Sequence, residues 1–193
     1  MTAQLFAPTA HDHNEHQFTT HQYHLMYETG VFLPCDRLEL INGEIKKMSP
    51  IGRKHATCVA RLNTLFVTRL LDKAIVWSQN PIRLDDKSEP QPDLAILKRR
   101  EDFYADALPK PLDILLIIEV ADSSIDYDRN VKAPLYAAAG IPEMWLFDVN
   151  KKAIEGYSLP SSSGYRQMRR YEADDSLAML AFPEVIFNWE ELF

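Results

Sequence analysis

Two acidic residues beside apolar stretches are the strongest candidates for chemistry in this sequence. Glu119 follows five consecutive apolar residues, 114–118, and such a run is typical of a strand covered on both faces. Asp93 directly precedes the apolar stretch 94–97, and two nearby prolines confine the chain before it to an extended conformation. Burying a carboxylate is costly unless a cation meets it, so Glu119 requires a positive partner unless the strand emerges into solvent there.

Asp93 and Glu119 would form an all-oxygen site if their strands are neighbours. Such a site suits Mg²⁺ or Mn²⁺ with several waters left in place. A pair of carboxyls could equally serve as the acid and base of a glycosidase, but no aromatic residues suited to stack on a sugar accompany these two. The pattern therefore favours a divalent metal ion.

Charge is distributed unevenly along the chain. The 21 basic and 28 acidic residues give a formal charge of −7, which argues against a protein that coats nucleic acid through bulk attraction. Residues 46–73 nevertheless contain seven basic residues and a single acid, Asp72, so this segment carries +6. It is either a solvated helix face or a local surface for an anion.

The expected elements alternate between helices and strands. Capping residues and apolar residues three and four positions apart predict helices over residues 20–29, 53–72 and 126–139. Asn42-Gly43, which tolerates positive φ, predicts a hairpin over residues 37–46. Further strands are expected over residues 74–78, 93–97, 112–121, 144–148, 153–157 and 165–171. This order predicts a mixed α/β (α+β) fold in which helices pack on a central sheet.

Length and composition fit one globular domain. With 193 residues, 46% of them hydrophobic and 25% charged, the chain is expected to form a single domain over residues 18–193 after a disordered arm, 1–17. Five of the six histidines fall within the first 24 residues, but no partners at a fixed spacing point to a metal site there. Neither a spanning stretch nor a signal-type N-terminus is present, so we expect a cytoplasmic protein with no membrane partner.

The order of several short motifs resembles the PD-(D/E)XK nuclease superfamily and, more closely, a family of restriction-endonuclease-like proteins abundant in cyanobacteria. The resemblance extends from about Thr19 to Tyr157. It rests on the following segments and residues, which stand in the family's order: Glu39 to Ile45, Met48-Ser49-Pro50, Gly52, His55, Gln91 to Leu94, Ile118-Glu119-Val120, Ser123-Ser124, Asp128, Lys132, Tyr136, Gly140 to Trp145 and Asp148.

The resemblance implies a restriction-endonuclease-like core and Mg²⁺- or Mn²⁺-dependent hydrolysis of DNA phosphodiester bonds. Asp93 and Glu119 match the paired acids that hold the metal, and Glu44 corresponds to an additional acidic ligand. His55 opens the long helix that faces this site. The basic residues of that helix would contact the DNA backbone; those expected to do so are Arg53, Lys54 and Arg61. A homodimer is expected because two copies most simply cut both strands of a duplex.

One departure from the superfamily pattern concerns its lysine. That residue should stand two positions after Glu119, where this chain has Ala121. The resemblance places the charge on Lys132 of the following helix, and Asp128, Lys132 and Tyr136 would share one helix face because they are four residues apart. Pro134 either kinks this helix or marks its real start. If Lys132 points away, the chain is a catalytically inactive module that binds nucleic acid or protein.

Simpler roles remain open for the supporting residues. Glu44 could lie in water beyond the hairpin, and His55 and Lys132 could be surface groups. Tyr136 could serve packing alone. A hydrolase that acts on a smaller phosphate ester is a third possible function, since the same metal chemistry would serve it.

Overall fold

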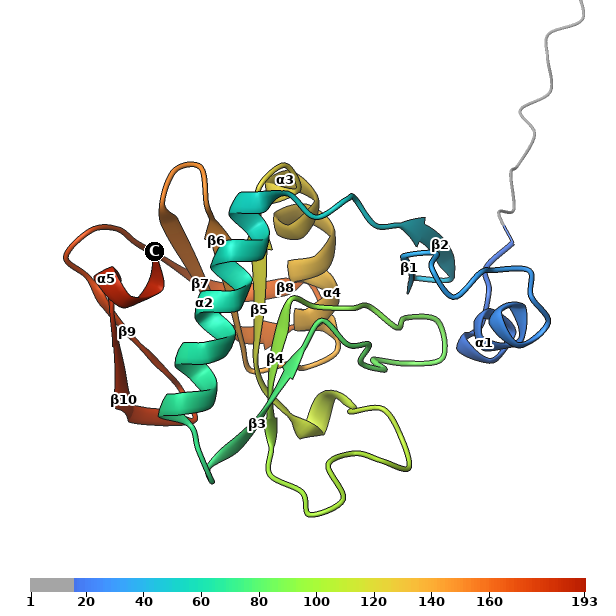
Figure 1. Cartoon of the computed structure of the whole chain (residues 1–193), viewed down its shortest axis with the longest axis horizontal. Helices are drawn as coiled ribbons and strands as arrows, with labels where there is room; N and C mark the ends of the chain where they lie inside the picture. Colours follow the sequence, from blue (N-terminus) through green and yellow to red (C-terminus); the bar gives the residue numbers. More distant parts are fainter. Residues whose placement is uncertain (1–15) are drawn as a thin grey trace, which may run out of the picture.

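The strands that carry the two candidate acids lie within a six-stranded mixed sheet (Figure 1). The computed structural model describes residues 16–193. The strand order is β3-β4-β5-β6-β7-β8; β5 and β6 run parallel and all other neighbours run antiparallel. The strands span β3 Ala74–Ser78, β4 Leu94–Lys98, β5 Ile114–Ala121, β6 Glu143–Asp148, β7 Ala153–Ser161 and β8 Gly164–Tyr171. A 3-10 turn, Pro111–Asp113, leads into β5.

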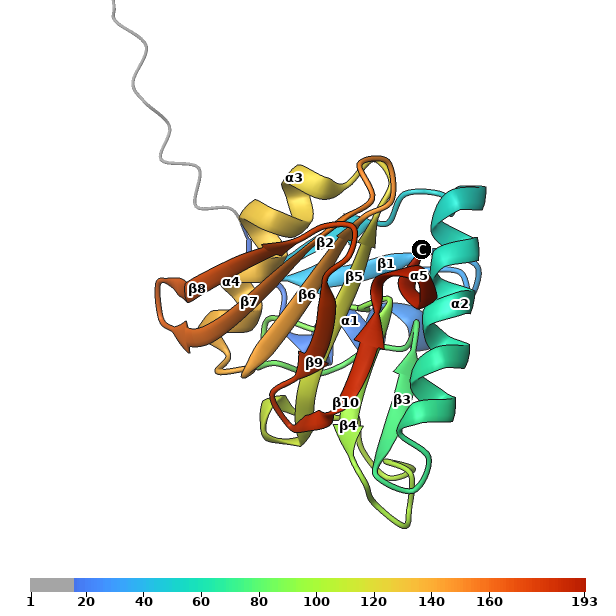
Figure 2. The ribbon, with the colours of Figure 1, turned by 90° about the vertical axis from the view of Figure 1, so that its left-hand side faces the viewer.

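The long helix α2, Arg53–Arg69, covers one face of this sheet (Figure 2). Its apolar side buries Leu62 and Phe66 against alternate residues of the central strands, including Ile96 and Ile118. The same core contains a C-terminal unit made of β9 Ser176–Met179, β10 Phe182–Asn188 and α5 Trp189–Leu192. Because side chains alternate along a strand, the residues between these, such as Glu119, point to the opposite face.

A composite helix covers that opposite face. It consists of α3 Ile125–Tyr127, a π-helical turn Asp128–Lys132 and α4 Ala133–Ala138. Pro134 has no backbone N–H and its ring would collide with the carbonyl four residues earlier in a regular helix. The wide turn directly before Pro134 accommodates both effects, so the chain passes the proline without breaking the helix.

The N-terminal elements lie to one side of the main sheet (Figure 1). Helix α1, Thr20–Glu28, begins with a capping box between Thr19 and Gln22. The hairpin β1 Leu38–Ile41 and β2 Glu44–Lys47 turns at Asn42 and Gly43, whose φ angles are 50° and 79°. A bridge between Leu40 and Glu89 attaches this hairpin to the segment that leads into β4.

The expected mixed α/β architecture is confirmed, with three differences in detail. Helix α2 ends at Arg69 rather than Asp72, because the chain reverses at Asp72 with a φ of 63°. Strand β7 continues past Tyr157 to Ser161, and the C-terminal elements β9, β10 and α5 were not expected at all. Of the expected arm over residues 1–17, residues 1–15 lie outside the described part of the chain, so that prediction stays untested. Between residues 16 and 193, no helix has the length and apolarity needed to cross a membrane.

Candidate functional site

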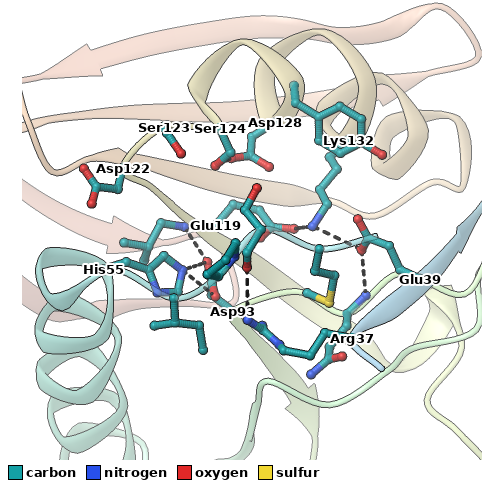
Figure 3. A pocket seen from close by; sticks show the side chains of 18 of the residues that line it. Arg37, Glu39, His55, Asp93, Glu119, Asp122, Ser123, Ser124, Asp128 and Lys132 are labelled. Carbon is teal, nitrogen blue, oxygen red and sulfur yellow. Dashed lines mark hydrogen bonds and ion pairs between the residues drawn. The ribbon is translucent and has the colours of Figure 1, made fainter. Parts of the chain in front are cut away.

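The register of β4 and β5 brings Asp93 beside Glu119. Leu94, the first residue of β4, pairs with Ile118 of β5. Asp93 directly precedes β4 and Glu119 follows Ile118, so both acids lie at this end of the β4–β5 pair and line one cavity. The Asp93 carboxyl also accepts a hydrogen bond of 2.8 Å from the backbone N–H of Val120. The two acids that the sequence singled out therefore meet, as Figure 3 shows.

Lys132 and Tyr136 reach Glu119 from the composite helix. The Lys132 ammonium lies 3.1 Å from Glu119 Oε1, and the Tyr136 hydroxyl donates to the same oxygen over 2.7 Å. Ala121 lies two residues beyond Glu119 and is also buried, so the ammonium next to Glu119 comes from the composite helix and not from β5. Asp128 belongs to the same group and accepts a hydrogen bond of 2.6 Å from Ser124.

His55 reaches Asp93 from the first turn of α2. Its Nε2 lies 2.9 and 3.0 Å from the two carboxyl oxygens, and this hydrogen bond raises the pKa of His55 against the opposing effect of burial. Gly52 precedes the helix at a close approach to Asp122, where a Cβ would lie only 2.8 Å from a carboxyl oxygen. Glycine at this position therefore lets α2 begin next to the end of β5.

Glu39, rather than Glu44, lines the cavity together with Asp93 and Glu119. Glu39 is buried on β1, its carboxyl lies 3.4 Å from the Lys132 ammonium, and it accepts a hydrogen bond of 3.3 Å from the backbone N–H of Gln91. Glu44 lies beside the hairpin turn, where it is exposed and paired with Lys46. Glu44 does not line the cavity that Glu39 lines, so the structure does not bring it together with Asp93 and Glu119, and its expected role as a metal ligand stays a prediction.

The buried groups carry an excess of negative charge. Glu39, Glu119 and Asp128 are each at most 4% exposed, and Lys132 is the buried cation among them. Burial raises the pKa values of Glu119 and Asp128, an effect that Lys132 opposes. Burial alone would lower the pKa of Lys132, but the carboxylates of Glu119 and Glu39 raise it. The raised pKa values favour the neutral forms of Glu119 and Asp128, and a further cation in the cavity would favour their ionised forms.

These side chains line an open cavity of about 450 Å³. Its wall also contains Arg37 and the backbone around Val120. Two buried polar atoms at this site, His55 Nδ1 and the hydroxyl of Tyr127, have no hydrogen-bond partner. Because buried polar groups are nearly always satisfied, these two atoms indicate that water or a ligand belongs in the cavity.

The donor set fits a hard divalent ion. Mg²⁺ is usually held by one or two carboxylates and keeps several waters, so a closed cage is unnecessary. Within residues 16–193 no three or more His, Cys, Asp or Glu side chains are arranged so that they could hold a metal ion together. Asp93 and Glu119 supply two carboxyls at the wall of a cavity that has room for water and a phosphate. The site thus fits the metal that the sequence suggested.

The basic residues expected to contact DNA lie elsewhere. Arg53, Lys54 and Arg61 line a separate cavity on α2, not the one that contains Asp93 and Glu119. At the other end of the basic segment, Arg69 and Lys73 are ion-paired with C-terminal glutamates. The basic segment 46–73 is therefore divided: Lys46, Arg69 and Lys73 are ion-paired. Among the residues that the structure describes, its other four cations have no acidic partner within 4.0 Å, and three of these four line the separate cavity.

Comparison with known proteins bears on the family and the fold. Residues 21–190 match the Uma2 family, described as "Putative restriction endonuclease". A solved structure from Anabaena variabilis ATCC 29413, described as "a putative nuclease belonging to DUF820", has a similar fold with a TM-score of 0.65. The two chains are 16% identical, and the similarity covers 81% of this chain and 89% of the other. No curated protein shows significant similarity to the sequence.

Proposed function

Because the chain belongs to the Uma2 family of restriction-endonuclease-like proteins, we propose that it is a metal-dependent endonuclease that hydrolyses DNA phosphodiester bonds. One observation carries the proposal: Asp93 and Glu119 lie side by side in a cavity whose buried acids outnumber its buried cation. The family's description supports the reaction class and the chemistry of the donor set supports the metal. The fold alone carries neither, since one fold serves many functions.

Asp93 and Glu119 would hold Mg²⁺ or Mn²⁺, and Glu39 would take the place expected for Glu44. When bound, such an ion would polarise a phosphate oxygen and lower the pKa of a coordinated water. Asp93 is already oriented by the N–H of Val120 and by His55, so little side-chain freedom would be lost on binding.

Lys132 is the residue best placed to act on the reacting phosphate. Its ammonium belongs to the cavity wall and is held by Glu119 and Glu39, so its position is fixed before substrate arrives. A fixed ammonium stabilises the negative charge that builds on phosphate oxygens in the transition state. Tyr136 and Asp128 would position Glu119 and Lys132 from the same helix.

A cleavage assay tests this proposal. The wild-type chain should nick or linearise supercoiled plasmid in Mg²⁺ or Mn²⁺ and not in EDTA, and Asp93→Asn and Lys132→Met should each lower the rate by about 10²-fold or more. Glu44→Gln is the matched control and should cleave at the wild-type rate. Binding of DNA without cleavage under every condition would favour the inactive module, whereas turnover of only small phosphate esters would favour the third function.

A homodimer in the cytoplasm is part of the same proposal. Two copies would place one site on each strand of a duplex. Light scattering of the purified chain should give twice the monomer mass, and a strict monomer that still linearises plasmid in one binding event would contradict the dimer.

A further inference from the structure

A second cavity, of about 460 Å³, adjoins the candidate active site at the start of α2. The two cavities share one helical turn: Gly52 and His55 line the first, and Arg53 and Lys54 line the second. Its volume falls within the usual range for ligand pockets, about 300–1,000 Å³. Helix α5 packs beside α2 at this place, as Figures 1 and 2 show.

The polar side of this second cavity consists of Thr57 and four cations. Four basic side chains line it: Arg53, Lys54, Arg61 and Lys152. Among the residues that the structure describes, none of the four has an acidic partner within 4.0 Å, and no acidic side chain lines the cavity. In a chain of net charge −7, such unpaired and exposed cations attract an anion locally.

The remaining wall is apolar. Val149, Leu192 and Phe193 contribute to it together with the buried Cys58. The Phe193 ring is half-buried and packs against the Trp189 ring at a centroid distance of 4.8 Å. This contact restricts the rotation of the Phe193 side chain. A cavity with cations on one side and an aromatic surface on the other matches a nucleotide, whose phosphate is anionic and whose base is flat and apolar.

A hydrogen-bonded link joins the two cavities. Lys54 donates to Asn150 over 2.8 Å, and the Asn150 amide donates to the backbone oxygen of Asp122 over 2.6 Å. Asp122 lines the first cavity. Lys54 of the second cavity is therefore joined through Asn150 to Asp122 at the wall of the first.

We propose that the second cavity binds a nucleotide of the DNA strand next to the phosphate that is cleaved. The four cations hold the backbone phosphates, and the base lies against Phe193 and Leu192. An acidic protein segment is the competing occupant, but it would use the cations and leave the apolar wall without a partner. The inference rests on the proposed function, since it assigns this cavity to the same DNA strand.

Binding of short labelled oligonucleotides to the wild-type chain in EDTA tests the inference without any cleavage. We expect Arg61→Glu combined with Lys152→Glu to weaken binding of an eight-nucleotide oligothymidylate about tenfold or more, and to lower the slope of log affinity against log salt by about 0.7 for each lost phosphate contact. Arg166→Glu combined with Lys98→Glu is the control and should change both much less, because it reverses two exposed cations that have no ion-pair partner among the described residues. Equal losses in the two charge variants would show bulk attraction and overturn the site.

An abasic oligomer of the same length tests the base contact. The wild-type chain should bind it about fivefold or more weakly than the oligothymidylate, because base stacking is lost. In Phe193→Ala, checked for folding by circular dichroism, the two oligomers should bind alike. Equal wild-type affinity for both oligomers, or equally tight binding of polyglutamate, would overturn the nucleotide assignment. Because binding is measured without metal, a chain that binds as expected but never cleaves would contradict the proposed function, while the assignment of the second cavity to a nucleotide would stand.

Discussion

Lys132→Met should destabilise the protein strongly at neutral pH and much less in mild acid. The ammonium lies 3.1 Å from Glu119 and 3.4 Å from Glu39, and Coulomb's law at an effective dielectric constant of ~20 gives about 5 kcal/mol for each contact. Methionine fills a similar space without charge, so the packing is largely kept. The carboxyls left behind are buried and have lost their cation.

Protonation limits the net loss. A buried carboxyl without its cation takes up a proton, and for an ordinary pKa near 4.3 this costs about 3.5 kcal/mol at pH 7 but under about 1 kcal/mol at pH 5. The expected loss in the free energy of unfolding is therefore about 3–5 kcal/mol at pH 7 and about 1–2 kcal/mol at pH 5. Removing Lys132 raises the folded-state pKa of Glu119 further above its unfolded value, so the stability of the variant falls as pH rises above about 4.3.

Urea unfolding at pH 5 and pH 7 measures both numbers. In thermal unfolding, the loss at pH 7 corresponds to a decrease in Tm of about 6–20 °C for a chain of this size. Lys98→Met is the matched control, since Lys98 is exposed at the end of β4, and it should change stability by less than about 0.5 kcal/mol at either pH. A loss for Lys132→Met that is the same at both pH values, or as small as in the control, would refute the reasoning.

Three further predictions concern the same site. Tyr136→Phe removes the 2.7 Å hydrogen bond to the buried Glu119 carboxyl and should lower the free energy of unfolding by about 1.5–3 kcal/mol, measured by urea titration; a neutral change would show that the hydroxyl is not needed. Glu39→Gln should reduce plasmid cleavage at least about tenfold, while Glu44→Gln should leave it unchanged. A loss of cleavage in Glu44→Gln but not in Glu39→Gln would instead assign the supporting role to Glu44. Saturating Mg²⁺ at about 100 times its Kd should add about 2.7 kcal/mol of stability, read from thermal unfolding. Because burial raises the pKa of Glu119, the affinity for Mg²⁺ should increase as pH rises, and calorimetry that shows proton uptake on binding would contradict this.

The meeting of Asp93 and Glu119 could be anticipated because each lies beside a stretch of apolar residues that only a central strand explains. The same reasoning applies to Glu39, which stands within the apolar sequence Leu38-Glu39-Leu40-Ile41. Glu44 instead stands next to an Asn-Gly turn, where side chains usually face water. What the sequence could not show is the bridge between Leu40 and Glu89, which brings β1 to the site.

The direction of Lys132 depended on how the helix passes Pro134. A regular helix would have been kinked there, and the π-helical turn that avoids this has no clear signature in the sequence. The C-terminal strands were missed for a different reason: Pro183 falls inside β10, where a proline argues against a strand, and the pairing with β9 is irregular between Phe182 and Ile186. The direction of Lys132 and the pairing of β9 with β10 can be determined only when the tertiary contacts are known.

A crystal of the wild-type chain soaked in Mn²⁺ tests the central claim most directly. The account predicts an anomalous peak in contact with the carboxyls of Asp93 and Glu119, with Lys132 still beside Glu119, and no such peak in an Asp93→Asn crystal treated in the same way. Full Mn²⁺ occupancy elsewhere in the molecule while these two carboxyls keep only His55 and Lys132 as partners would contradict it.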